Sequence, residues 1–131
     1  TILFGNHRQA IFLVDNDCYG TLITQHYNLV GTLDDCMLEE SQGYDLIGAD
    51  PLLGALADNG GPTSTHALQP GSPAIDAANP AGCFGIADVL LTTDQRGHPL
   101  PWDGDADGTA RCDIGAFEAP LTIVYLPMTE K

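Results

Sequence analysis

Residues 58–78 read Asp-Asn-Gly-Gly-Pro-Thr-Ser-Thr-His-Ala-Leu-Gln-Pro-Gly-Ser-Pro-Ala-Ile-Asp-Ala-Ala, a run in which turn-forming and apolar residues alternate. In the two turn segments, residues 59–62 and 69–73, glycine supplies a positive φ and proline a fixed φ. The apolar pieces Ala67-Leu68 and Ala74-Ile75 are too short for helices and suit single strands that turn a sharp corner. This alternation is typical of a solenoid.

Four motifs follow one another along the chain, and their sequences are Leu56-Ala-Asp-Asn-Gly-Gly-Pro-Thr63, Gly71-Ser-Pro-Ala-Ile-Asp76, Thr93-Asp-Gln-Arg-Gly97 and Cys112-Asp-Ile-Gly-Ala-Phe-Glu118. In this order they resemble the C-terminal region of the secreted bacterial proteins called choice-of-anchor proteins, of the Q type. The match runs from about Asp17 to Glu118. The resemblance implies a right-handed parallel β-helix on an exported protein, with a variable anchoring tail after the last motif. It implies no established catalytic activity.

We therefore predict an all-β fold for residues 1–118, a short right-handed parallel β-helix with an irregular C-terminal cap that disulfides pin. The expected strand pieces are residues 1–4 and 10–14 in a first turn of the solenoid, 21–24 and 27–30 in a second, and then 46–48 and 52–54. Residues 33–44 are expected to form a solvated acidic excursion. Residues 119–131 are predicted to be an extended tail, which contains the strongest strand signal of the chain.

The composition restricts the range of partners. The chain has 131 residues, of which 44% are hydrophobic, and this is enough to bury one core. With 18 acidic and 4 basic residues its net charge is −14, which repels phosphate backbones and anionic membranes. We therefore expect no nucleic-acid partner. No apolar run has the length of a membrane span, and none is predicted.

The four cysteines are Cys18, Cys36, Cys83 and Cys112, and none of their spacings is the Cys-x-x-Cys of a zinc site. A disulfide framework in an exported protein is the better interpretation. Four cysteines can form two disulfides in three different ways. We favour the local pairs, Cys18 with Cys36 and Cys83 with Cys112, because adjacent turns of a solenoid stack about 4.8 Å apart, within disulfide reach.

An acidic loop has the pattern of a calcium site. Residues 103–108 read Asp-Gly-Asp-Ala-Asp-Gly, in which Asp103, Asp105 and Asp107 alternate as in the opening of a calcium loop. The twelfth position is Ile114, where a full EF-hand loop has Glu, but Asp113 precedes it and could contribute a ligand. The predicted cofactor is Ca²⁺, and the alternative is an acidic surface turn that binds no ion specifically.

The candidate catalytic groups do not form a convincing active site. Ser64, His66, Ser72 and Asp76 lie close in sequence, but the Gly-x-Ser-x-Gly context of a nucleophile elbow is absent. The acidic residues of 33–44 are sequence neighbours, which is poor evidence for the separated carboxylates of a glycosidase. We expect these residues to serve turns and corners, and we expect the protein not to be an enzyme.

The two ends of the chain are complementary. The N-terminal end is a β-edge without a polar cap, and the C-terminal strand has no obvious place in its own cap. We predict that one subunit donates this strand to the edge of the next through residues Thr1, Ile2, Leu3 and Phe4 on the acceptor and Leu121, Ile123, Val124, Tyr125 and Leu126 on the donor.

The predicted function is thus that of an extracellular or cell-surface structural protein whose partners are copies of itself in a filament. The alternative is a secreted carbohydrate-binding or polysaccharide-lyase-like module that acts on a cell-surface polysaccharide. A lyase usually needs a basic residue in a carboxylate-lined groove. The chain offers only Arg8, Arg96, Arg111 and Lys131, and Arg96 is expected to pair with a carboxylate.

Overall fold

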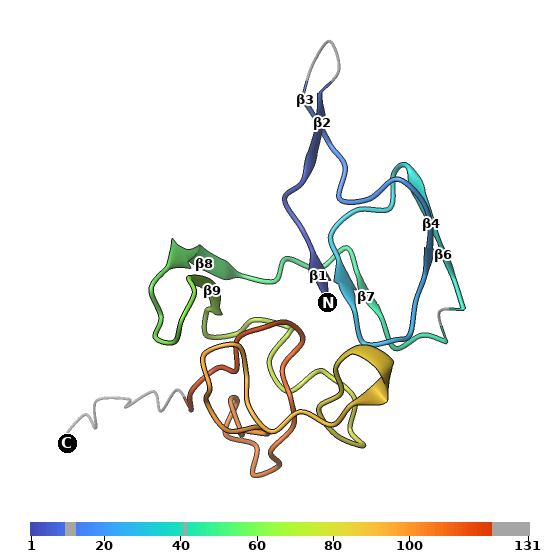
Figure 1. The fold of residues 1–131 in the computed structure, drawn as a ribbon. Helices are drawn as coiled ribbons and strands as arrows, with labels where there is room; N and C mark the ends of the chain where they lie inside the picture. The colour runs from blue at the N-terminus through green and yellow to red at the C-terminus, as the bar shows by residue number, and fades with distance from the viewer. Residues whose placement is uncertain (10–12, 41, 122–131) are drawn as a thin grey trace, which may run out of the picture.

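The computed structural model describes residues 1–9, 13–40 and 42–121 (Figure 1). Its elements are β1 (Ile2–Leu3), β2 (His7–Gln9), β3 (Leu13–Asp15), β4 (Gly20–Ile23), β5 (Leu29–Val30), β6 (Cys36–Glu39), β7 (Leu46–Ile47), β8 (Leu53–Ala57), β9 (Thr65–Leu68) and the 3₁₀ helix η1 (Ile86–Asp88). The strands fall into four separate sheets, with orders β1-β5-β7, β2-β3, β4-β6 and β8-β9. All of these strands are short because glycine, proline and aspartate interrupt the sequence between them.

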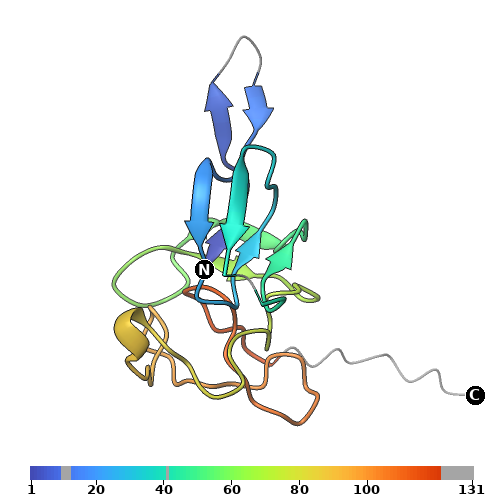
Figure 2. The ribbon, with the colours of Figure 1, turned by 90° about the vertical axis from the view of Figure 1, so that its right-hand side faces the viewer.

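Among the described residues, parallel pairing of strands is confined to residues 2–47. Ile2 of β1 lies opposite Leu29 of β5, and Leu29 lies opposite Leu46 of β7. Strands β4 and β6 pair in parallel as well, with Gly20 opposite Cys36, and Figure 2 shows them side by side. The central strand β5 is fully buried, and its Leu29 is one of the largest buried side chains.

The two remaining sheets are antiparallel hairpins. In β2–β3, His7 lies opposite Asp15, and the hairpin projects from the rest of the molecule at the top of Figure 1. In β8–β9 the pairing is irregular between Leu53 and Leu56, and Ala57 lies opposite Thr65. Residues 58–64, which carry the first turn segment of the sequence, connect β8 to β9.

The C-terminal part, residues 69–121, is built almost entirely of turns, and we call it the cap. Within the described residues it contains η1 and three isolated bridges but no strand. The core lies where the cap meets the strands, and its buried members are Leu29, Leu68, Ala74, Ile114, Phe117 and Ala119. No helix in the described part of the chain is long and apolar enough to cross a bilayer.

The prediction of a right-handed parallel β-helix is wrong. The strands form four small sheets, two of them antiparallel, and no solenoid sheet runs through the described residues. The expected first turn is strand β1 followed by a hairpin that folds back on itself. The physical reason is that turn residues fix corners but not partners, and the hairpins β2–β3 and β8–β9 pair locally, so the parallel ladder of β1, β5 and β7 does not continue through them.

The disulfides are those expected from the sequence. Cys18 is bonded to Cys36 with the Cα atoms 5.7 Å apart, and Cys83 is bonded to Cys112 with a Cα separation of 5.6 Å. The first joins the segment before β4 to the start of β6, and the second joins two loops of the cap. Two disulfides are consistent with an extracellular protein, because such bonds persist in oxidising compartments.

Candidate metal centre and the cleft beside strand β1

A group of buried carboxylates holds the cap together by accepting backbone N–H groups. Asp113 accepts the N–H of Asp76 at 2.8 Å on one oxygen and that of Ala119 at 2.6 Å on the other. Glu118 accepts the N–H groups of Trp102 at 2.7 Å and Asp113 at 3.1 Å. We call Asp76, Asp94, Asp113 and Glu118 the carboxylate network, because each ties together backbone segments that are distant in sequence.

Arg96 completes this network on one side. Its guanidinium donates through Nε and Nη2 to Asp94 at 2.8 and 2.6 Å, and Nη2 also donates to the carbonyl of Glu118 at 2.6 Å. The guanidinium carbon lies 3.6 Å from the centre of the Phe117 ring, a cation–π contact. The expected pairing of Arg96 with a carboxylate is therefore confirmed, and both side chains of the pair are buried.

Burial shifts the acidity of this network. It raises the pKa of Asp113 to about 7, although the hydrogen bonds from the N–H groups of Ala119 and Asp76 lower it. The charges of Glu118 and Asp76 add to the rise. Burial also raises the pKa values of Asp76 and Glu118. Burial acts in the same direction on Asp94, but the N–H of Glu118 and the Arg96 guanidinium outweigh it and leave the pKa of Asp94 lowered. The network thus holds more carboxylates than its one guanidinium can neutralise.

Asp76 connects the network to the acidic loop. One carboxylate oxygen accepts the N–H groups of Gly104 and Asp105, both at 3.0 Å, and the other accepts that of Arg111 at 3.1 Å. Gly104 approaches too closely for a side chain, since a Cβ there would lie 2.8 Å from the Cγ2 of Ile75. Both ends of the loop are therefore fixed to a single buried side chain.

Asp76, Asp103 and Asp105 form the candidate metal centre. Each offers one carboxylate oxygen, and these oxygens all lie within 4.8 Å of one another. The Oδ1 atom of Asp103 is buried and has no hydrogen-bond partner, while its Oδ2 accepts the N–H of Gly108 at 3.0 Å. Carboxylate oxygens are ligands for hard cations such as Ca²⁺, which takes about six to eight oxygens, so carbonyls or waters would have to complete the shell.

Two of the four predicted metal ligands lie elsewhere. Asp107 is exposed and accepts the N–H of Thr109 at 2.7 Å within its own turn. Asp113 belongs to the carboxylate network, where both oxygens are already bonded. The structure brings Asp103 and Asp105 together with Asp76, which the sequence singled out only as a member of a doubtful triad. Its left-handed backbone, with φ of 53°, reflects a special turn position that the sequence pattern does not reveal.

The serine, histidine and aspartate of that triad make separate contacts. Ser72 donates its hydroxyl to the carbonyl of Pro51 at 2.6 Å, and the Nδ1 of His66 bonds to the carbonyl of Gly54 at 2.8 Å. The carboxylate of Asp76 takes the three N–H groups given above. All three side chains thus bond backbone groups of different segments, and Ser72 and Asp76 lie in turns as expected, whereas His66 lies in strand β9.

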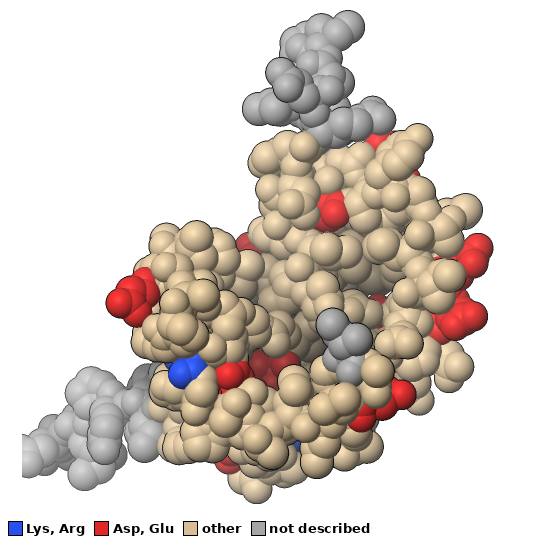
Figure 3. Space-filling view, viewed as in Figure 1, with Lys and Arg blue, Asp and Glu red and all other residues tan. Residues whose placement is uncertain are grey.

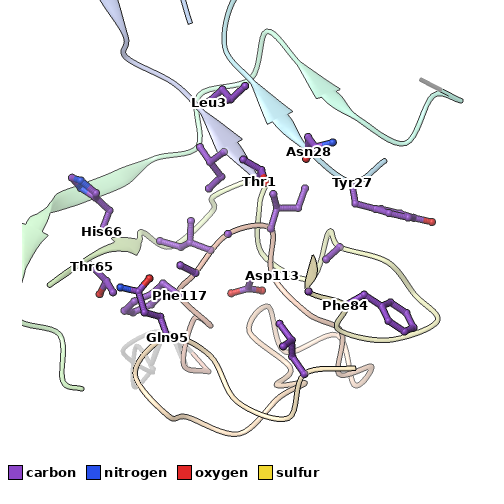
Figure 4. Close-up of a pocket in the computed structure, with 18 of the residues that line it drawn as sticks. Thr1, Leu3, Tyr27, Asn28, Thr65, His66, Phe84, Gln95, Asp113 and Phe117 are labelled. Atoms are coloured by element: carbon purple, nitrogen blue, oxygen red, sulfur yellow. The ribbon is translucent and has the colours of Figure 1, made fainter. Parts of the chain in front are cut away.

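A cleft of about 960 Å³ lies between β1 and the cap (Figure 4). Its apolar part is formed by side chains from β1, the β8–β9 hairpin and residues 113–117, namely Ile2, Leu53, Leu56, Leu68, Ile114 and Phe117. The predicted acceptor residues Thr1, Ile2, Leu3 and Phe4 all line it. Of the predicted donor residues Leu121 is 40% exposed, and Ile123, Val124, Tyr125 and Leu126 lie outside the described residues.

The cleft has an aromatic rim. His26 and Tyr27 both line it and both have left-handed φ angles, of 71° and 56°. Tyr27 stacks on Tyr44 with ring centres 5.3 Å apart. Thr24 supports this turn by accepting the N–H of His26 at 2.9 Å and donating to Asp45. In Figure 3 the acidic side chains are spread around the molecule, so the visible face has no single charged groove.

The first prediction concerns the network. Asp113→Asn replaces an oxygen that accepts a backbone N–H with an amide that can only donate, so one buried N–H loses its partner. At pH 5.5, where the folded protein keeps Asp113 protonated because its pKa is raised to about 7, we expect the free energy of unfolding to fall by about 1–3 kcal/mol, measured by urea denaturation with disulfides intact. The matched control is Asp107→Asn, which keeps its turn and should change stability by less than about 0.5 kcal/mol. Equal effects of the two variants would contradict the assigned role.

The second prediction concerns pH. Because the pKa of Asp113 is raised to about 7 from 3.8, the folded protein keeps a proton between these values that the unfolded chain has lost. The free energy of unfolding should therefore fall as the pH rises from about 4 to 7. The lowered pKa of Asp94 has the opposite effect on stability. It stabilises the folded protein near neutral pH, and this stabilisation is lost only at more acidic pH.

Denaturation in chelator at pH 5.5 and pH 8 measures this difference in stability. The difference should shrink in Asp113→Asn and persist in Asp107→Asn. A protein that is more stable at pH 8 would contradict the prediction.

Comparisons with known proteins give no relative to guide the function. No family model, no curated protein and no solved structure matches the chain. The resemblance to choice-of-anchor proteins therefore stays a prediction from four motifs. The function has to be inferred from the carboxylate network, the candidate metal centre and the cleft.

Proposed function

We propose that this protein is an extracellular structural subunit that assembles head-to-tail with copies of itself. The observation that carries the proposal is the unpaired edge of β1, which ends the sheet β1-β5-β7 among the described residues and borders the cleft. An open strand edge beside an apolar surface is a template for another strand. Proteins that remain monomeric usually cover such an edge.

The donor in this proposal is the C-terminal strand. Residues 121–126 read Leu-Thr-Ile-Val-Tyr-Leu, an uncharged run with strong β propensity. In an extended strand Leu121, Ile123 and Tyr125 share one face, while Val124 and Leu126 share the other. Because donor and acceptor are different surfaces, the contact is heterologous and propagates into a ring or an open filament.

A bound cation is part of the proposal. We infer that Ca²⁺ is the ion, because the centre offers three carboxylates and no nitrogen or sulfur ligand. Its role would be structural, since it would neutralise the charge around Asp76 and fix the loop that Asp76 already holds. The disulfides and this ion would together order a cap that has no strand ladder of its own.

The third prediction tests the ion. Ca²⁺ should stabilise the wild-type protein, by about 2.7 kcal/mol at a concentration 100 times the dissociation constant. Asp105→Asn keeps the turn bond to the N–H of Asp107 but loses a charged ligand, so its affinity should fall on the order of tenfold. Asp107→Asn is the control and should bind as the wild type does. Isothermal titration calorimetry measures both, and equal affinities in the two variants would place the ion elsewhere.

The fourth prediction tests assembly. A chain that ends at Pro120 should fold, keep both disulfides and remain monomeric, whereas the full chain should form polymers. Sedimentation velocity and negative-stain electron microscopy distinguish the two states. In the full chain, Val124→Pro should act like the truncation because it removes an N–H and blocks a strand.

The matched control is Val124→Thr, which keeps the N–H and the β propensity and should polymerise. Fibres formed by the truncated chain would exclude strand donation by the tail.

A further inference from the structure

We propose that the edge of β1 and the apolar floor of the cleft are the acceptor site for residues 121–126 of a second copy of the chain. This inference rests on the proposed head-to-tail assembly and specifies where the contact forms. Its elements are a backbone edge with which no described strand pairs, an apolar surface beneath that edge, and a donor without charge.

The backbone of β1 is paired on one side. Leu29 donates its N–H to the carbonyl of Thr1 at 2.8 Å, and Gly31 donates to the carbonyl of Leu3 at 2.9 Å. In a parallel pair, alternate residues direct their N–H and C=O groups to opposite edges. The N–H and C=O of Ile2 therefore point away from β5, toward the side on which no described strand pairs with β1. An extended peptide backbone satisfies such groups, and a compact ligand does not.

The floor beneath this edge is apolar and fixed. Ile114 and Phe117 belong to the core and, at 1% and 7% exposure, support the floor from below, whereas the apolar lining that a partner strand can contact includes Leu56 and Phe84, at 62% and 42% exposure. Ile2 packs directly on the same loop, since a Cβ on Gly115 would lie 3.2 Å from its Cδ1. The N–H of Ile114 bonds to the carbonyl of Ala74 at 2.8 Å, which anchors the loop in the cap. The acceptor is therefore formed before the partner binds.

The cleft is large, since its volume of about 960 Å³ lies near the upper end of the roughly 300–1,000 Å³ of small-molecule sites. Residues 121–129 carry no charge, and only Glu130 and Lys131 follow. Asp113, which Figure 4 places in the cleft, already has both oxygens bonded to backbone N–H groups.

The test separates the edge N–H from the side chain of Ile2. Ile2→Pro removes the N–H that points to the partner and keeps the β1–β5 bonds, because proline is tolerated where the N–H faces outward. Ile2→Ala loses comparable side-chain contacts but keeps the N–H. Because both variants lose side-chain contacts in the cleft, we expect the concentration needed for assembly to rise in both, and to be on the order of tenfold higher in Ile2→Pro than in Ile2→Ala. Near-ultraviolet circular dichroism checks that both variants fold.

A second measurement locates the contact directly. Tyr125→p-benzoylphenylalanine, introduced in the full chain, should form photo-adducts between chains at cleft residues such as Ile2, Leu56 or Phe84, identified by mass spectrometry. Tail-dependent polymers with adducts elsewhere, or polymers unaffected by Ile2→Pro, would overturn this acceptor and leave the proposed assembly intact. Adducts in the cleft that join two parts of one chain would show that the tail of the same chain occupies the cleft, and would overturn the inference of a second copy. If no tail-dependent polymers form, the proposed assembly itself is overturned.

Discussion

The bond between a buried carboxylate and a backbone N–H is the interaction on which the cap depends. A segment without strand ladders or long helices has to satisfy its buried N–H groups by other means. Asp76 takes three of them, and Asp113 and Glu118 take two each. Each of these buried N–H groups would destabilise the fold by about 1–3 kcal/mol if it had no partner. These few side chains thus replace the ladder that a sheet would supply.

This solution concentrates negative charge in the interior. Arg96 compensates Asp94, but Asp76, Asp113 and Glu118 rely on N–H dipoles alone, and burial raises their pKa values. Part of the acidic composition therefore lies in the interior. A cation beside Asp76 would offset the same repulsion. This repulsion would favour a cation at the proposed centre whatever the sequence of the loop.

Local chemistry could be predicted from the sequence, and long-range pairing could not. The disulfide pairs and the pairing of Arg96 with a carboxylate were confirmed. Strand β6, Cys36–Glu39, was missed because acidic residues surround it, although Cys36 is buried and Met37 is exposed, as alternation requires. Asp76 was missed as a candidate ligand because its N–H donors lie 28, 29 and 35 residues further along the chain. The prediction of a β-helix was wrong because turn motifs fix the corners of the chain but not the order in which its strands pair.

Asp76 also joins the two regions to which a function is assigned. Its carboxylate holds the acidic loop, and its N–H bonds to Asp113, which lines the cleft beside Ile114. Ile114 is bonded in turn to Ala74, two residues before Asp76. An ion that fixed Asp76 would therefore also stiffen the floor on which a partner strand would lie. A stiffer acceptor loses less conformational entropy on binding, so this short chain of hydrogen bonds gives a structural ion a physical route to strengthen assembly without contacting the partner.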